Sequence, residues 1–171
     1  MTTHSPTTGD VIDLTAERIA YGGEVVGRYE GLVVFVPFGA PGDRLRVRIT
    51  ERKKNYARGI IEEIIADSPI RRPPACRYFG RCGGCHFQHI EYAAQLEAKS
   101  SFISESLKRV AGVDWPHRIE VRPSVEYGYR ARAELKSEQS AGGEIRIGFN
   151  RLKSRSICDV EHCPVLVPQL D

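Results

Sequence analysis

The sequence has no long apolar run, no strong excess of one charge and no internal repeat. None of its segments approaches the roughly 20 apolar residues that a bilayer-spanning helix requires. The first ten residues are polar and rich in threonine, so they lack the apolar centre of a secretory signal peptide. We therefore expect a cytoplasmic protein with no membrane partner, whose thiols stay reduced.

The net charge is small, because 25 Lys and Arg residues oppose 22 Asp and Glu residues to give +3. A nucleic-acid partner must therefore be argued from where the charges lie along the chain. The length of 171 residues allows one domain or two small ones. Hydrophobic and charged contents of 41% and 27% are ordinary for a globular protein.

The five cysteines are the most informative residues. Cys76, Cys82 and Cys85 follow a C-x5-C-x2-C spacing, and Cys158 and Cys163 lie far along the chain. Grouped cysteines in a reducing compartment more often bind metal or act in catalysis than form disulfides. Zinc sites typically use two C-x2-4-C pairs. Three thiols from one loop and one from a distant segment are instead typical of iron–sulfur clusters, so the spacing favours a [4Fe–4S] cluster.

Cys163 is our candidate for the fourth ligand, because Pro164 follows it, as proline follows the last cysteine of bacterial ferredoxin ligand runs. Cys158 lies in an expected strand and is better explained as a small buried hydrophobic residue. The pair Gly83-Gly84 is expected to turn tightly and to aim backbone N–H groups at the sulfurs. Nearby histidines remain alternative ligands. These are His86, His89 and His162.

The first third of the chain predicts a small β-barrel. Short apolar or alternating runs are separated by Gly and Pro turns at residues 11–20, 25–26, 32–36, 45–49 and 57–65. Five short strands in so few residues favour a closed, OB-like barrel. A β-sandwich is the alternative that periodicity leaves open.

Positive charge is concentrated at residues 44–58, which hold seven basic residues and one acidic residue, Glu51. Small barrels often bind single-stranded nucleic acid, with basic side chains on phosphates and aromatic rings under bases. A solvated strand face is the alternative. If RNA binds here, we expect phosphate contacts from Arg52, Lys53, Lys54 and Arg58, and stacking on Tyr56.

A proline-rich linker at residues 68–74 precedes the cysteines, and an amphipathic helix is expected at 91–110, stopped by Gly112. Further strands are expected at 119–121, 130–135, 145–149 and 157–160, with a hairpin turn at Gly142-Gly143. The fold class is thus mainly β with one helix (α+β). A second basic patch comprises Arg146, Arg151, Lys153 and Arg155.

Several motifs together resemble the RNA (uracil-C5)-methyltransferase family. They are Lys53-Lys54-Asn-Tyr56-Ala57-Arg58-Gly59, Ser68-Pro69, the run from Cys76 through Cys85-His86-Phe87-Gln88-His89, Tyr129-Arg130-Ala-Arg132-Ala-Glu134-Leu135, Ile147-Gly148-Phe149-Asn150 and His162-Cys163-Pro164-Val165-Leu166. The resemblance runs from about residue 11 to the last residue.

The resemblance implies an RNA-binding TRAM domain of the OB-like type (residues 1–67), an iron–sulfur loop and helix (68–112) and the start of a β-rich RNA-binding central domain (113–171). It also implies that Cys163 is a cluster ligand. Arg130 and Arg132, in the segment that resembles the central domain, are expected to belong to a second RNA-binding surface. The 87–89 loop is expected to face RNA. The family transfers a methyl group from S-adenosylmethionine to C5 of a uridine in ribosomal or transfer RNA, and we expect rRNA.

The chain departs from that family in its chemistry. It has no Gly-rich turn between a strand and a helix for the cofactor, and every cysteine lies in or beside the proposed cluster. We therefore expect the catalytic domain to be missing from this chain. The chain should bind RNA and an iron–sulfur cluster but should not methylate RNA. We also expect a monomer that does not bind DNA. A stand-alone RNA-binding module with a structural zinc is the main alternative, and a ferredoxin-like electron carrier is a weaker one.

Overall fold

The computed structural model describes residues 5–139 and 142–171, and the chain forms two compact units. We call Met1–Arg72 with His89–Val121 the barrel unit, and Pro73–Gln88 with Arg122–Asp171 the cysteine unit. In the described residues, no helix has both the length and the apolar composition to cross a bilayer.

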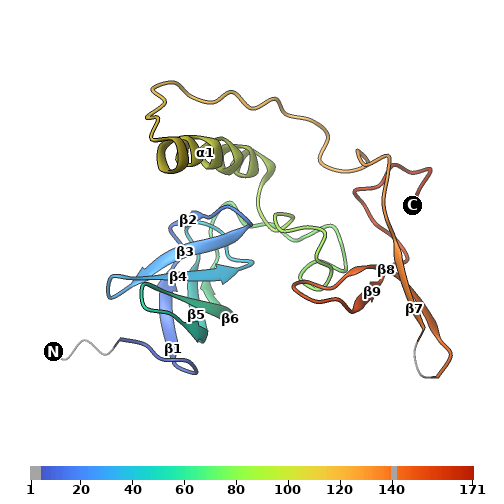
Figure 1. The fold of residues 1–171 in the computed structure, drawn as a ribbon, viewed down its shortest axis with the longest axis horizontal. Helices are drawn as coiled ribbons and strands as arrows, with labels where there is room; N and C mark the ends of the chain where they lie inside the picture. Colours follow the sequence, from blue (N-terminus) through green and yellow to red (C-terminus); the bar gives the residue numbers. More distant parts are fainter. Residues whose placement is uncertain (1–4, 140–141) are drawn as a thin grey trace. The chain divides into compact units, whose positions relative to one another are not determined.

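The barrel unit is built on one curled six-stranded sheet in the order β1-β5-β6-β4-β3-β2 (Figure 1). All neighbouring strands are antiparallel except β4 and β6, which are parallel. The strands are β1 Val11–Thr15, β2 Arg18–Ile19, β3 Glu24–Tyr29, β4 Leu32–Pro37, β5 Arg44–Arg52 and β6 Tyr56–Ala66.

The curl brings the end of β1 against β3. The Glu17 N–H donates to Val26 O at 2.8 Å, and a Cβ at Gly27 would lie 2.4 Å from Thr15 O. Only glycine permits this approach, so position 27 fixes how tightly the sheet closes. The sheet is a half-barrel, and the first run expected from sequence is two strands, which makes six instead of five.

The core of the barrel unit follows the alternation expected for β5. Leu45, Val47 and Ile49 are buried, while Arg46 and Arg48 point outward. Arg46 pairs with Asp13 and Glu63, and Arg48 pairs with Glu62. The other strands add further buried apolar side chains to the core, namely Ile12, Leu14, Val25, Val26, Val34, Val36 and Ala57.

The helix α1 spans Tyr92–Ala111, close to the expected range. Gly112 ends it with a φ of 68°, and its N–H donates to Leu107 O, as a left-handed C-cap does. Phe102 contacts the Tyr21 ring edge-on at 6.0 Å, but no helix residue is buried. The amphipathic face therefore packs only loosely on its own unit.

The cysteine unit carries a second antiparallel sheet, in the order β7-β8-β9. Its strands are β7 Lys136–Gln139, β8 Ile145–Asn150 and β9 Ile157–Asp159. Gly143, with a φ of 86°, lies in the β7–β8 connection as expected, whereas Ser140 and Ala141 lie outside the described residues.

Two expected strands are wrong. Residues 119–121 form no strand, and in 130–135 only Arg130 pairs, in an isolated bridge with Leu166. The alternation at 130–135 sets alanine against charged residues, and alanine offers too little apolar surface to hold a strand on a core.

Candidate functional site

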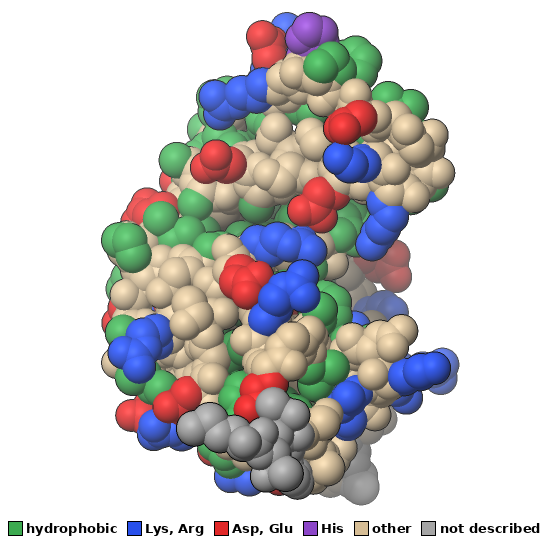
Figure 2. Space-filling model, turned by 90° about the vertical axis from the view of Figure 1, so that its left-hand side faces the viewer, with side chains coloured by type: hydrophobic (Ala, Val, Ile, Leu, Met, Phe, Trp, Pro, Cys, Tyr) green, Lys and Arg blue, Asp and Glu red, His purple; other side chains and the backbone are tan. Residues whose placement is uncertain are grey.

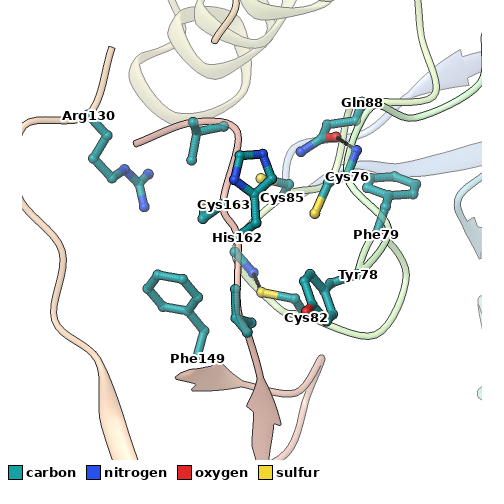
Figure 3. A pocket seen from close by; sticks show the side chains of 13 residues that line it. Cys76, Tyr78, Phe79, Cys82, Cys85, Gln88, Arg130, Phe149, His162 and Cys163 are labelled. Atoms are coloured by element: carbon teal, nitrogen blue, oxygen red, sulfur yellow. Dashed lines mark hydrogen bonds between the residues drawn. The ribbon is translucent and has the colours of Figure 1, made fainter. Parts of the chain in front are cut away.

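Four cysteines from two distant segments meet at one cavity of the cysteine unit. Cys76, Cys82 and Cys85 come from the loop 76–85, and Cys163 follows β9 (Figure 3). The cavity has a volume of about 30 Å³. Its remaining walls are mainly apolar and aromatic, with contributions from Tyr78, Phe79, Phe149, Val160 and Val165.

The loop is shaped by local backbone hydrogen bonds. The Phe79 N–H donates to Cys76 O and the Cys82 N–H to Tyr78 O, at 3.0 and 2.9 Å. Gly80 has a φ of 82°, a left-handed conformation that permits this double turn. The Gly83 N–H then donates to Asn150 O at 2.9 Å, which fixes the loop to the end of β8.

The pKa values of the Cys82 and Cys85 thiols are raised above their ordinary value. Burial raises the pKa of both, and neighbouring cysteines raise the pKa of each further. The Gly84 N–H donates to Cys82 Sγ at 3.4 Å and Gln88 hydrogen-bonds to Cys85, which favours the thiolates. Such thiols are neutral until a cation replaces their protons, as metal binding does.

Gln88 also connects the two ends of the loop, because its Oε1 accepts from the Cys76 N–H at 3.0 Å. Arg130 lines the same cavity, and its charge also favours the Cys85 thiolate. His162 lines the cavity too and pairs with Asp171. The other two candidate histidines do not line it.

Cys158 is buried in β9, 3% exposed, and does not line the cavity. Within the described residues, no group of three or more His, Cys, Asp or Glu side chains is arranged to hold a metal ion. The four cysteines nevertheless all line the same cavity.

The candidate RNA-binding residues of the barrel unit lie around the β5–β6 turn. The turn is tight, because the Lys53 N–H donates to Tyr56 O at 2.9 Å. Lys54 is exposed at its tip. Arg52 donates to Tyr56 O and to Ser5 Oγ.

Two of the predicted phosphate ligands are engaged by carboxylates. Lys53 Nζ lies 2.9 Å from Glu51, which raises the pKa of Lys53. Arg58 pairs with Glu24 and lies 3.8 Å from Glu51. Lys and Arg side chains alternate with Asp and Glu on the face shown in Figure 2. The charge run in the sequence is therefore partly neutralised in the fold.

Tyr56 belongs to an aromatic group that the sequence did not indicate. Because β4 and β6 are parallel, Phe35 pairs with Arg58 and lies beside Tyr56. The two rings meet edge-on at 5.8 Å, and the Arg58 guanidinium lies 5.4 Å from the Phe35 ring centre. Phe35 was missed because its partners are 21 and 23 residues away in sequence.

Arg130 and Arg132 are exposed residues of the cysteine unit. The backbone of Arg130 pairs with residues 165–167, whereas Arg132 has no strand partner among the described residues. The expectation that the 87–89 loop faces RNA is wrong for Gln88 and His89, which are 7% and 2% exposed.

His89 instead belongs to a buried group in the barrel unit. Its Nε2 lies 2.9 Å from Gly39 O. Nearby, the fully buried Asp43 carboxylate accepts from the backbone N–H groups of Ala40 and Ser68 and pairs with Arg71. Burial by itself would raise the pKa of Asp43, but these hydrogen bonds lower it.

Known proteins match this chain along most of its length. Residues 6–61 match the TRAM domain family, which confirms that part of the resemblance. An uncharacterized RNA methyltransferase of Aquifex aeolicus is 34% identical over 153 residues, or 89% of this chain and 35% of the relative. The 23S rRNA (uracil(1939)-C(5))-methyltransferase RlmD of Klebsiella pneumoniae is 37% identical over 170 residues, or 96% of this chain and 37% of the relative.

Among solved structures, the Pyrococcus abyssi tRNA (uracil-54, C5)-methyltransferase in complex with S-adenosyl-L-homocysteine is 30% identical with a TM-score of 0.56. It covers 91% of this chain, which covers 33% of that protein. This chain thus spans about a third of the length of each of these three proteins. Over more than 90% of its length, the chain is thus similar to proteins named as RNA (uracil-C5)-methyltransferases.

Proposed function

We propose that this chain is the RNA-binding, [4Fe–4S]-containing N-terminal part of an S-adenosylmethionine-dependent RNA uridine-C5 methyltransferase. The observation that carries the proposal is the meeting of Cys76, Cys82, Cys85 and Cys163 at one cavity, in a chain that also has a TRAM domain. The proposed parts are residues 1–67, 68–112 and 113–171, and the TRAM match lies within the first.

Four thiolates at one cavity are a ligand set used both by structural zinc ions and by [4Fe–4S] clusters. We choose the cluster because three of the thiolates come from one loop and the fourth from a distant segment, a spacing typical of iron–sulfur sites. With all four irons ligated by cysteine, the cluster would hold the loop to the segment after β9 and would leave no iron for substrate.

Anaerobic purification tests the cluster. We expect a brown protein with about four irons and four acid-labile sulfides per chain. Cys163→Ser should lose the absorbance and most of the iron, whereas the matched variant Cys158→Ala should keep them. A colourless protein containing zinc would favour the stand-alone zinc module instead.

The RNA surface proposed for the barrel unit places Arg52, Lys53, Lys54 and Arg58 on phosphates, with a base stacked near Tyr56. Arg130 and Arg132 are proposed as a further basic contact in the cysteine unit. Two relatives are 23S rRNA methyltransferases and the similar solved structure is a tRNA methyltransferase; we choose rRNA because the two rRNA enzymes are the more similar in sequence. Binding of a single-stranded rRNA segment should weaken with salt and with the double variant Arg52→Gln, Lys54→Gln.

The methyl transfer itself is proposed to need residues beyond these 171. Activating C5 of a uracil requires a nucleophile that adds to C6. All five cysteines of this chain are engaged in the cavity or buried in β9. Incubation of the purified chain with RNA and labelled S-adenosylmethionine should give no methylated uridine, and any turnover above background would contradict this.

A further inference from the structure

The cysteine cavity is built from two segments that are far apart in sequence. Cys76, Cys82 and Cys85 share one loop, whereas Cys163 follows β9. A metal–thiolate bond is only about 2.3 Å long, so a cofactor bound by all four thiolates needs the two segments at a fixed separation. A contact between the segments that protein groups make by themselves would set that separation.

Tyr78 makes such a contact through its hydroxyl. The oxygen accepts from the Glu161 N–H at 3.1 Å and from the Arg77 guanidinium at 2.7 Å. Tyr78 comes two residues after Cys76, and Glu161 comes two residues before Cys163. The tyrosine is 6% exposed and lines the cysteine cavity (Figure 3). One buried side chain therefore joins the loop to the segment of the fourth cysteine.

The ring and the backbone of Tyr78 are themselves held within the loop. The guanidinium groups of Arg77 and Arg81 lie 4.9 and 5.6 Å from the centre of its ring, at distances typical of cation–π contacts. Arg81 also donates to Arg77 O at 3.1 Å. The Tyr78 carbonyl accepts from the N–H groups of Arg81 and Cys82 at 3.0 and 2.9 Å. The hydroxyl is therefore presented from a fixed position beside the ligand Cys82.

Other contacts of the loop are less suited to setting this separation. An ion pair joins Arg77 to Glu161, but the two side chains are 64% and 75% exposed, and exposed pairs contribute little to stability. The Gly83 N–H donates to Asn150 O, which fixes the loop to the end of β8 and not to the segment before the fourth cysteine. The buried hydroxyl of Tyr78 is the better candidate.

We propose that Tyr78 is a positioning residue of the cysteine cavity, whose hydroxyl holds the segment carrying Cys163 at the separation from the loop that a shared cofactor needs. The inference rests on the proposed function, because the cofactor meant is the proposed [4Fe–4S] cluster. Tyr78 is not a ligand. It acts by pre-organising the fourth thiolate, which lowers the entropic cost of binding and slows the loss of the cofactor.

The test measures how fast the anaerobically purified chain releases iron to an excess of a ferrous chelator. Tyr78→Phe keeps the ring and removes the hydroxyl, so it should bind the cluster with unchanged absorbance but release iron about tenfold faster, the size expected for one lost hydrogen bond. Tyr129→Phe, at an exposed tyrosine of the same unit, should stay within about twofold. Arg77→Gln should stay within about threefold. An effect of Arg77→Gln equal to that of Tyr78→Phe would assign the link to the ion pair and overturn the proposal.

Hydrogen exchange separates positioning from a general loss of stability. In Tyr78→Phe the Glu161 amide should exchange about tenfold faster, while the Cys82 amide, which donates to a backbone oxygen, stays within about twofold. Equal losses at both amides would show a merely structural role and would overturn the proposal. If the unmodified chain holds the cluster and Tyr78→Phe releases iron at the same rate, the positioning role is wrong and the proposed function stands. An unmodified chain without iron and sulfide would overturn the proposed function and this inference together.

Discussion

The two units of this chain are stabilised in different ways. The barrel unit buries apolar side chains from all six strands. The cysteine unit buries only Tyr78, Ile157, Cys158, Val165 and Leu166 among its described apolar residues, and its sheet leaves Ile145 and Ile147 64% and 49% exposed. A unit with so small a core usually needs a cross-link or a metal. The proposed cluster would supply such a cross-link through the four cysteines of the cavity.

The largest expected effect is a loss of folding stability in the cysteine unit alone. Cys85→Ser removes one thiolate of the proposed cluster, and metal binding is then no longer coupled to folding. Hydrogen exchange should show amide protection in β8 falling at least about 100-fold while that in β5 changes less than about threefold. Cys158→Ala is the control. Equal protection of β8 in the Cys85→Ser variant and the unmodified chain would mean that the small core suffices.

The next effect is specific to the barrel unit. Asp43→Asn keeps the shape of the side chain but takes the buried negative charge away from Arg71. Removing one partner of a buried pair typically costs about 3–5 kcal/mol, because the other charge stays buried. Chemical denaturation should show a loss of this size. Asp13→Asn, which affects an exposed pair with Arg46, should cost less than about 1 kcal/mol.

Features set by neighbouring residues could be predicted from the sequence, whereas contacts between distant strands could not. The alternation of Leu45, Val47 and Ile49 and the stop at Gly112 are local signals, and both were confirmed. The strand expected at 130–135 was wrong because alternation carries no information about side-chain volume. The partners of Arg58, which are Glu24 and Phe35, were not predictable, since they come from strands whose parallel and antiparallel pairing the sequence does not state.

Among the candidate ligands, the spacing identified three cysteines as one loop, and the Cys-Pro pair picked the distant Cys163, which the structure brings to the same cavity. That these four hold a cluster remains a prediction. The 87–89 loop was misjudged because a polar Gln-His pair indicates exposure, whereas Gln88 and His89 are buried through hydrogen bonds to the Cys76 N–H and to Gly39 O.

A smaller effect is a dependence of the stability of the barrel unit on pH, caused by the buried His89. Burial lowers the pKa of His89 more than its hydrogen bond to Gly39 O raises it, so the folded barrel unit keeps the ring neutral below the ordinary value of 6.5. The unfolded chain takes up a proton there and the folded chain does not, so stability is lost as pH falls below about 6.5. The free energy of unfolding should fall by up to about 1.4 kcal/mol per pH unit.

His89→Gln is the variant that checks this assignment. Equilibrium denaturation between pH 7.5 and 5 should show a flatter pH dependence for the variant than for the unmodified chain, whatever its stability at pH 7.5. The same slope in both chains would assign the pH dependence to another group. The Asp43 carboxylate contributes at lower pH, because its pKa is lowered from an ordinary value of 3.8.

The smallest expected effect is a change in RNA affinity when an acidic residue that neutralises cations of the barrel unit is replaced. Glu51 engages Lys53 directly and lies near Arg58, so it competes with phosphate for two of the proposed barrel ligands. Glu51→Gln should therefore tighten RNA binding by about threefold to fivefold at 0.1 M salt and steepen its salt slope by up to about 0.7.

Glu62→Gln is the matched control, because it frees Arg48 on the same strand pair, outside the proposed RNA-binding residues. A similar gain from both variants would mean that net charge alone governs binding. A gain confined to position 51 would locate the RNA at the β5–β6 turn and show that the barrel unit holds its cations partly neutralised.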